Sequence, residues 1–558
     1  MVEEGDSGVN TAASHLIPKP RYAYLLAKGA GMKGWEGGKR DWGYISTFFR
    51  EEPGGCAAEL IDDRTWDDLD LGDVFRLLDR TRSSVGQAAL FRLMRTPLED
   101  AVFRTRTAKI SALIEDETGR VRASRILGRL GFQRDGEIYG FLSYVSMTIR
   151  EDRRFIFPVL GVLAALSALA PAFLGLPGLA VTVGIVLVNF IVHYSCKAKV
   201  ETESPSFAYL HRLLTAAERL SRLGIPALQS EISGLRALVP GLRRLRSRTR
   251  FLFGSGGLAM DVMGMLSEYI KIMFLLEVTA YYFSHNEMIS RMADLKSAYR
   301  IVGEIDAVTA IAAFRAESGA CITPELEAGK RLLDAQGVIH PLLPDAVPNS
   351  IRLDGKGVIV TGSNMSGKST FLRTLGVNQV LASTLCTVFA RSYRSSFFLT
   401  VSSITSRDSL RRAESRYLSE AKRMLFILKC VKDGLPVLAI IDEILSGTNS
   451  EERIAASIRL LRAVAGGAGL VVAATHDREI AAALDGAYAN SHFTHEIGEA
   501  AAPAASGSPV GALEFDYVLR NGIVERGNAI RLLAHIGFPP EITGVTDPKT
   551  RTSGPAGT

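Results

Sequence analysis

The sequence predicts a multidomain α + α/β protein, in which a mainly helical region is followed by an α/β domain. Three observations support this prediction. Apolar residues recur at helical spacing over much of the first 335 residues. The stretch between residues 155 and 194, which includes a Pro/Gly turn, carries no charged side chain. From about His340 onward, β-rich apolar runs alternate with helical patterns and end in polar loops, as in a parallel sheet.

Composition places the chain among folded proteins. It has 558 residues, 47% of them hydrophobic and 22% charged, which fits about two to four domains. The formal net charge of +6 permits contact with phosphates or an anionic membrane surface. The five cysteines lie far apart and form no CxxC pair, which argues against structural zinc and favours reduced thiols. The acidic N-terminus lacks the apolar core of a secretory signal.

The predicted organisation has six segments. A flexible lead-in covers residues 1–60, and the helical core starts over 61–150, where Pro97 is expected to end the second helix. A two-helix transmembrane hairpin covers 151–200, and the helical core continues over 201–335. The α/β domain covers 336–540, and a flexible tail covers 541–558.

The apolar hairpin runs from Phe155 to Tyr194. Residues 155–174 and 179–194 carry no charge, and a GLPG turn separates them. A helix needs about 20 apolar residues to cross the hydrocarbon core of a bilayer, which the first stretch supplies and the second supplies only with the turn. The alternative is a helical hairpin buried in a soluble core. We favour the membrane because two consecutive charge-free stretches are unusual in soluble folds.

The charges beside the hairpin predict its orientation. Arg153 and Arg154 precede it, and Lys197 and Lys199 follow it. By the positive-inside rule, both ends lie in the cytoplasm and the turn lies outside. We therefore expect an inner-membrane protein whose termini and α/β domain are cytoplasmic. The stretch 251–283 is also apolar but carries acidic residues and a lysine, so it is expected to form a core helix pair; a third membrane element is the alternative.

A dense basic run lies in the second helical segment. It offers contacts to phosphates of DNA or lipid, against the simpler interpretation of a solvated helix face. Its expected phosphate-binding residues are Arg243, Arg244, Arg246, Arg248 and Arg250.

The strongest motif is a P-loop, which fits G-x-x-x-x-G-K-[ST] without deviation and lies between a predicted strand and a predicted helix. Glycines allow backbone N–H groups to surround phosphates, and the helix N-terminus adds a positive dipole. Lys368 is expected to reach the β- and γ-phosphates of ATP, and the Ser369 hydroxyl to bind Mg²⁺. The expected nucleotide-binding residues are Gly362, Ser363, Asn364, Met365, Ser366, Gly367, Lys368, Ser369 and Thr370.

Two further motifs end predicted strands. The apolar run 437–441 leads to Asp442 and Glu443, which are expected to hold Mg²⁺ and to orient or deprotonate the attacking water, respectively. The strand 470–474 is followed by His476, which is expected to contact the γ-phosphate or the water. On its own, an apolar run before Asp-Glu is weak evidence for ATP hydrolysis, and so is a lone histidine. After a P-loop, both indicate ATP hydrolysis with Lys368, Glu443 and His476 as catalytic residues.

These motifs resemble the MutS family of DNA mismatch-repair ATPases in order and wording. TGSNMSGKST resembles the family's P-loop, with Ser363 and Ser366 where its best-known members carry Pro and Gly. DEILSGTNS resembles its Walker B segment, and ATHD resembles its switch histidine. The residue at the family's adenine-packing aromatic position is Ala346, so base stacking is expected to be weaker or to come from elsewhere. The resemblance implies an ABC-like P-loop α/β ATPase domain that follows a helical core and lever region.

The resemblance also implies a homodimer. The segment 408–420 resembles the family's signature, where a serine reaches the partner subunit's nucleotide, so Ser415 is the trans-acting candidate. Ala413 and Glu414 replace the expected Gly-Arg. The segment 527–539 resembles the helical part through which two ATPase domains pair. The sequence before Ile61 is too short for the family's mismatch-reading and connector domains, so the resemblance supports the ATPase and the dimer more strongly than mismatch repair.

These observations lead to one hypothesis and two alternatives. The hypothesis is a dimeric, membrane-tethered, MutS-like ATPase with ATP and Mg²⁺ as cofactors and DNA as partner. The alternatives are an ATP-dependent scaffold for a membrane-protein partner and a transport or remodelling ATPase without a DNA role. Two spans per subunit are few for a translocation path, which disfavours transport. Salt-sensitive DNA binding would separate the hypothesis from both alternatives.

Overall fold

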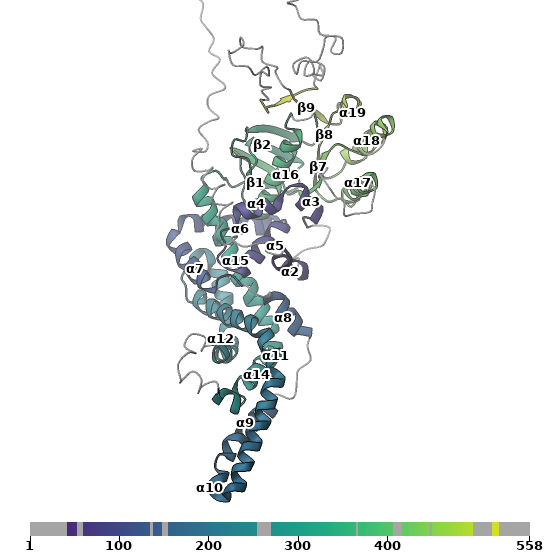
Figure 1. Ribbon diagram of the computed structural model, residues 1–558. Coiled ribbons are helices and arrows are strands. Elements are labelled where there is room, and N and C mark those ends of the chain that lie inside the picture. The colour runs from purple at the N-terminus through teal and green to yellow at the C-terminus, as the bar shows by residue number, and fades with distance from the viewer. Residues whose placement is uncertain are drawn as a thin grey trace, which may run out of the picture.

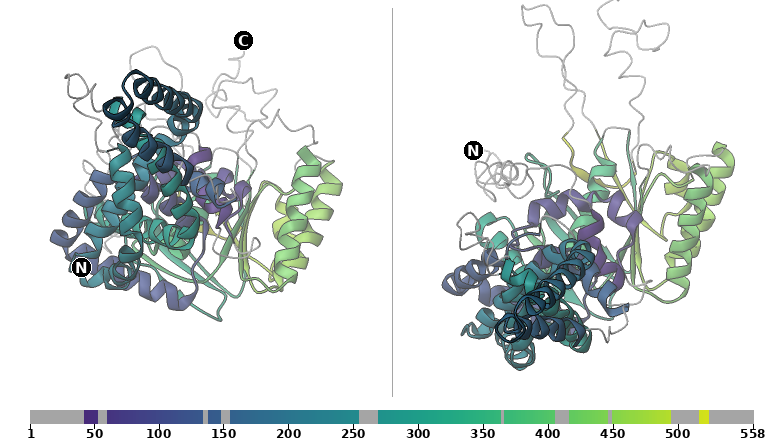
Figure 2. Two further views of the ribbon diagram at one scale, coloured as in Figure 1. Left: turned by 90° about the horizontal axis from the view of Figure 1, so that it is seen from below. Right: turned by 60° about the horizontal axis from the view of Figure 1, so that its bottom comes forward.

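The computed structural model describes residues 42–52, 60–133, 138–147, 155–253, 269–363, 366–404, 416–445, 449–494 and 516–523. An α/β domain lies at one end, a helical body in the middle and a narrow helical arm at the other end (Figure 1). Viewed from the end of the arm, the helices gather on one side and the sheet with its outer helices on the other (Figure 2). The mainly helical N-terminal part and the α/β C-terminal part confirm the predicted order of fold classes.

The helical body begins inside the predicted lead-in. Its first helix packs Phe48 against Tyr139 and Tyr299, with ring centroids 4.8 and 5.2 Å apart. The prediction of a flexible lead-in over residues 1–60 was therefore wrong for α2 (Trp42–Glu51), whose packing partners lie far along the chain. The first helices are α2 (Trp42–Glu51), α3 (Asp63–Asp68), α4 (Leu71–Leu78), α5 (Ser84–Arg95), α6 (Asp100–Glu115), α7 (Glu117–Leu130) and α8 (Ile138–Met147).

The arm is built from α9 (Ile156–Ser167), α10 (Ala170–Leu174) and α11 (Leu176–Ser221). The first apolar stretch is thus two short helices and not one span; Pro171 stands in the first turn of α10, where a proline is tolerated in a new helix but disfavours continuation of the previous one. The chain turns at Gly175, whose φ is +62°. α11 then continues as one helix across the predicted boundary at residue 200 into the helical body.

The two sides of the arm pack closely through small and polar residues. A Cβ on Gly178 would lie 2.2 Å from the carbonyl oxygen of Ala170, so only glycine allows this approach. The Thr182 hydroxyl donates to the carbonyl of Ser167 at 2.5 Å. Asn189 donates to the carbonyls of Leu160 at 3.2 Å and Met273 at 2.8 Å, and so joins α9, α11 and the segment before α14.

Three longer helices complete the body. They are α12 (Gln229–Phe253), which follows the short 3-10 helix η4 (Pro226–Leu228), then α14 (Leu276–Ser290) and α15 (Met292–Ser318). The stretch 251–283, expected to be a core helix pair, is described only at its two ends. α12 ends at Phe253, and residues 276–283 form the start of α14.

The α/β domain holds two sheets. The larger has the order β10-β9-β4-β8-β7-β6, with all neighbours parallel except β9 and β10. Its strands are β4 (Val358–Thr361), β6 (Leu399–Ser403), β7 (Val437–Asp442), β8 (Leu470–Thr475), β9 (Ala489–Phe493) and β10 (Leu519–Asn521). The smaller sheet has the order β1-β5-β2-β3, from β1 (Glu325–Glu327), β2 (Leu332–Val338), β3 (Asn349–Asp354) and β5 (Ser392–Ser396). The domain's helices are α16 (Lys368–Leu385), α17 (Arg416–Lys432), α18 (Ser450–Ala465) and α19 (Arg478–Ala483).

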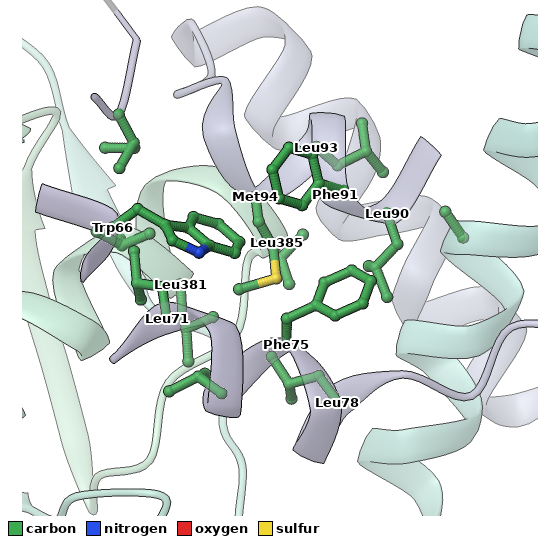
Figure 3. Packing of buried hydrophobic residues seen from close by; sticks show 14 of the residues in the cluster. Trp66, Leu71, Phe75, Leu78, Leu90, Phe91, Leu93, Met94, Leu381 and Leu385 are labelled. Carbon is green, nitrogen blue, oxygen red and sulfur yellow. The ribbon is translucent and has the colours of Figure 1, made fainter. Parts of the chain in front are cut away.

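The helical body and the α/β domain share one hydrophobic core. Leu381 and Leu385 of α16 face Trp66, Phe75 and other apolar side chains of α3, α4 and α5 (Figure 3). Each such leucine or aromatic side chain contributes about 1.5–3 kcal/mol on full burial. The helix that follows the P-loop is therefore packed directly against the helical body.

Polar contacts reinforce this junction. Buried Arg423 of α17 pairs with Asp62, donates to the Thr65 hydroxyl at 2.7 Å, and donates to the carbonyl of Ser402 at the end of β6 at 2.5 Å. Asp68 accepts from the Ser402 hydroxyl at 2.8 Å and from the backbone N–H of Ile404 at 2.9 Å. α3 thus contacts both β6 and α17, which lie on either side of residues 405–415 in the sequence.

Candidate functional site

Three parallel strands bring the predicted motifs to one edge of the larger sheet. β4 pairs with β8 so that Thr361 lies opposite Thr475, and β7 pairs with β8 so that Asp442 lies opposite Ala474. The residues that follow these strands therefore meet at their shared carboxyl end, where open α/β sheets bind ligands. The P-loop, the Asp-Glu pair and the histidine are therefore close in space although they are far apart in the sequence.

The described part of the P-loop has the backbone that its glycines predict. Gly367 has φ +99°, a conformation that residues with a side chain rarely adopt, and it directly precedes α16. Lys368 is the first residue of α16 and is buried. Its Nζ donates to the carbonyls of Gly362 and Ser363, both at 2.7 Å, so the ammonium lies within the loop. Burial lowers the pKa of Lys368, and the nearby Asp442 and Glu443 oppose that shift.

Ser369 and Asp442 lie together, as the predicted Mg²⁺ site requires. Burial raises the pKa of Asp442, whereas a hydrogen bond with the Ser369 side chain lowers it. A hydroxyl and a carboxylate are hard oxygen ligands of the kind that Mg²⁺ prefers, and Mg²⁺ commonly uses few protein ligands together with substrate phosphates. The pair fits such an ion. Within the described residues no group of three or more His, Cys, Asp or Glu side chains gathers into a separate metal site.

Glu443 lies at a strained turn directly after β7. Its φ is +51°, and its backbone N–H donates to the carbonyl of Ala474 at 3.1 Å. This bond fixes the end of β7 against β8. The Glu443 carboxylate is 3.4 Å from Nδ1 of His476, measured from Oε1. Strain of this kind, about 1–3 kcal/mol for a non-glycine residue with positive φ, gathers at functional sites.

Two residues that sequence reasoning missed hold the other side of His476. Arg453 of α18 donates from Nη2 to Oδ1 of Asp477 at 3.0 Å, and the same Nη2 is 3.4 Å from Nε2 of His476. In the tautomer with a proton on Nδ1, Nε2 of the ring accepts from Arg453 and the protonated Nδ1 faces the Glu443 carboxylate. Asp477 directly follows the histidine and could have been noticed. For Arg453, the sequence gives no indication of a role at the site except its place in the helix that follows the Asp-Glu segment.

A cavity of about 380 Å³ opens beside the P-loop. It lies between the segment that contains His340, the start of α16, β9 and Tyr517. A volume in this range suits a small-molecule ligand. Burial, aided by the positive charge of Arg373, lowers the pKa of His340 to about 4, so the ring is neutral near pH 7. Ala346 also lines this cavity, as its position beside the expected base site predicts.

Tyr517 supplies an aromatic ring at this cavity. Its side chain is 43% exposed, and a Cβ built on Gly367 would lie 3.1 Å from its Cδ1. Asn349 holds the backbone around it, since its Nδ2 donates to the carbonyl of Tyr517 at 2.9 Å and its Oδ1 accepts from the N–H of Leu519 at 2.7 Å. The two phenylalanines of the lining, Phe371 and Phe493, are almost fully buried. Sequence reasoning missed Tyr517 because it lies about 150 residues after the P-loop, outside any motif.

Comparison with known proteins identifies the protein family. The sequence profile described as MutS domain V matches residues 358–551. The chain is 27% identical over 263 residues to "Endonuclease MutS2" of Streptococcus sanguinis, a match over 45% of this chain and 31% of that protein. It is 27% identical over 261 residues to "DNA mismatch repair protein MutS" of Thermus aquaticus, over 46% of this chain and 30% of that protein. The chain belongs to the MutS family.

The family match has a defined extent. The "DNA mismatch repair protein MutS" of Caulobacter vibrioides is 32% identical over 176 residues, which is 29% of this chain and 19% of that protein. The chain thus matches about a third or less of the length of these MutS relatives. The profile match begins with β4 and covers the P-loop, the Asp-Glu pair and His476.

Several predicted residues fall outside the described part of this MutS-family chain. They are Asn364 and Met365 of the P-loop, Ser415 of the signature-like segment, and the segment 527–539 that resembles a pairing element. Of the basic run on α12, Arg246 forms an ion pair with Glu218, and Arg248 forms one with Glu287. Arg243 and Arg244 are exposed, and the side chain of Arg250 is not described.

Proposed function

We propose that the chain binds and hydrolyses ATP with Mg²⁺ at the carboxyl end of β4, β7 and β8. The observation that carries the proposal is the convergence of the P-loop, the Ser369–Asp442 pair and the Glu443–His476 pair at one sheet edge. Membership in the MutS family supports it independently.

Each residue has a separate role in this proposal. Lys368 and the backbone N–H groups at the start of α16 bind the phosphates. Ser369 and Asp442 hold Mg²⁺, which neutralises charge on the phosphates when it is bound. Glu443 orients and deprotonates the attacking water, and His476 stabilises the transferred phosphoryl group or that water. Asp477 and Arg453 position the His476 ring, and Tyr517 stacks on the base in place of the aromatic residue that Ala346 replaces.

Two variants test this proposal. Lys368→Ala should abolish ATP binding in an equilibrium assay. Glu443→Gln keeps the size of the side chain but removes the base, so it should retain binding while hydrolysis falls by about 10²–10⁴-fold. Normal hydrolysis in Glu443→Gln would refute the assignment of the base.

We further propose that the arm holds the protein in a membrane, with both ends and the α/β domain in the cytoplasm. α11 is the one helix of the described residues that is long and apolar enough to cross a bilayer, and only 17% of its most apolar window is buried. At the tip, Phe173 is 84% exposed and Leu176 is 86% exposed. From Leu176 to Tyr194, α11 rises about 28 Å, close to the hydrocarbon thickness of about 30 Å. Such a long row of exposed apolar side chains is unusual on a soluble monomer.

Alkaline carbonate extraction of cell membranes tests the tether. The full chain should stay in the membrane pellet, whereas a peripheral protein would move to the supernatant. A variant that replaces Phe173 and Leu176 with Glu should shift to the supernatant if the tip enters the bilayer. Release of the unmodified chain by carbonate would contradict the proposal.

The partner that we propose is DNA, with the chain acting as a homodimer in which Ser415 contacts the other subunit's nucleotide. Two of the relatives are named as a DNA mismatch repair protein and an endonuclease, and these names support DNA as partner. An ATP-dependent membrane scaffold, or a transport or remodelling ATPase, is the alternative, and the exposed arm also suits a membrane-protein partner. Duplex binding that weakens with salt would favour DNA, and its absence would favour the alternative.

A further inference from the structure

α7 and its neighbours carry an arginine-rich surface that no motif predicted. We call it the α7 arginine surface. Its six arginines are all exposed and come from the loop before α5, from α7 and from the part of α11 inside the helical body: Arg82, Arg122, Arg125, Arg129, Arg212 and Arg219.

The helix itself separates its basic face from its apolar face. Ala123, Leu127 and Leu130 are buried in the core. The arginines at 122, 125 and 129 recur at spacings of three and four, so they line one exposed face and span about 10 Å along the helix. Between Glu117 and the end of α7 there is no acidic residue.

The C-terminal end of α7 brings three arginines of different elements together around Gly131. Ser83, which follows Arg82, pairs with Gly131 in a β-bridge. Tyr209 of α11 donates from its hydroxyl to the Gly131 carbonyl at 3.1 Å. The guanidinium of Arg212 lies over the Tyr209 ring at 5.0 Å and 4.0 Å from the position of a Gly131 Cβ. Arg129 lies two residues before Gly131 in the sequence.

These arginines lack acidic partners within the described part of the chain, where no ion pair involves any of the six. Other arginines nearby differ, because Arg222 and Arg246 both pair with Glu218. Like charges three or four residues apart destabilise a helix by about 0.2–0.5 kcal/mol per pair. Repulsion among these arginines therefore slightly destabilises the unbound protein, and a bound polyanion would neutralise it.

We propose that the α7 arginine surface binds the phosphate backbone of duplex DNA; this rests on the proposed DNA partner and adds the place of contact. Guanidinium groups match phosphates in geometry and charge. The exposed face of α7 carries no aromatic side chain on which single-stranded bases would stack. α7 lies on the flank of the helical body, well away from the tip of the arm, so it is poorly placed for a bilayer that the arm enters (Figure 1). The contact positions DNA without reading its sequence.

The test compares two double variants with equal loss of charge, in protein reconstituted in neutral-lipid nanodiscs. Arg125→Gln with Arg129→Gln alters the proposed surface and should lower the salt slope. Arg243→Gln with Arg244→Gln alters the exposed pair on α12, which is the competing phosphate site, and should leave the slope unchanged. The readout is the slope of log affinity against log salt for a labelled 30-base-pair duplex. Each lost phosphate contact reduces this slope by about 0.9. The slope of the α7 variant should therefore be smaller in magnitude than that of wild type by about 1.8. Between 50 and 200 mM salt, the affinity of this variant should then fall by a factor about 12-fold smaller than the affinity of wild type does.

Further measurements separate the outcomes. Replacing the same two residues with Lys should restore the slope, and basal ATP hydrolysis should stay at the wild-type rate in every variant. An unchanged slope in the α7 Gln variant, with wild type binding duplex, would overturn the surface while leaving DNA as partner. No duplex binding by wild type at 50 mM salt would overturn DNA as partner and the surface with it. Loss of binding to vesicles containing phosphatidylglycerol, with an unchanged duplex slope, would assign the surface to lipid and overturn the proposal.

Discussion

Replacement of Tyr517 by Ala tests where the nucleotide base binds. Tyr517 is the exposed ring of the cavity beside the P-loop, whereas Phe371 and Phe493 are 3% and 2% exposed and so present little surface to a ligand. Stacking of a base on an aromatic ring contributes about 1–3 kcal/mol. Loss of the ring should therefore weaken ATP binding by about 5- to 150-fold. Tyr517→Phe keeps the ring and should bind ATP almost as wild type does.

Isothermal titration calorimetry with two ligands distinguishes base stacking from a general disturbance of the loop. Tripolyphosphate lacks the base, so its affinity should be the same in wild type and in Tyr517→Ala. Equal weakening of ATP and tripolyphosphate would show that Tyr517 supports the loop and not the base. Unchanged ATP affinity in Tyr517→Ala would refute the stacking role altogether.

Three further predictions concern the site and the arm. Asp477→Asn should lower kcat about tenfold, equal to about 1.4 kcal/mol in the barrier, at unchanged ATP affinity, because it loosens the His476 ring; a change in affinity alone would contradict this role. Burial holds the pKa of His340 at about 4, below its unfolded value of 6.5, so the stability it supplies is complete above about pH 6.5 and is lost as pH falls toward 4. Urea unfolding in detergent should show a loss of at most about 3 kcal/mol between pH 7 and 4, and His340→Asn should lose less; equal losses would reject the role of His340. Asn189→Leu removes the hydrogen bonds to the carbonyls of Leu160 and Met273, so it should increase proteolysis within the arm, and an unchanged cleavage rate would argue against this contact.

The motifs that could be predicted from the sequence are those in which the functional residues directly follow an apolar strand. An apolar strand followed at once by a P-loop, by Asp442 and Glu443, or by His476 is visible in a single stretch of sequence. Parallel pairing then brings the three together without further information. The larger division into a helical part and an α/β part followed in the same way from local periodicity.

The parts that could not be predicted depend on contacts between distant residues. Arg453 reaches Asp477 from the next helix, and Tyr517 reaches Gly367 from far along the chain. α2 is stabilised by aromatic partners in α8 and α15. Hydropathy alone also treated residues 155–174 as one helix, although α9 ends at Ser167 and Pro171 lies in the first turn of a second helix. Local patterns carry no direct information on such pairings.

ATP hydrolysis by the detergent-solubilised protein should be measured beside that of its Glu443→Gln variant, with and without duplex DNA at two salt concentrations. We expect Mg²⁺-dependent hydrolysis by wild type, retained ATP binding without turnover in the variant, and stimulation by DNA that fades as salt rises. Equal hydrolysis by the two proteins would contradict the proposed active site. Robust, Glu443-dependent hydrolysis that ignores DNA would preserve the site and direct the search for a partner to membrane proteins.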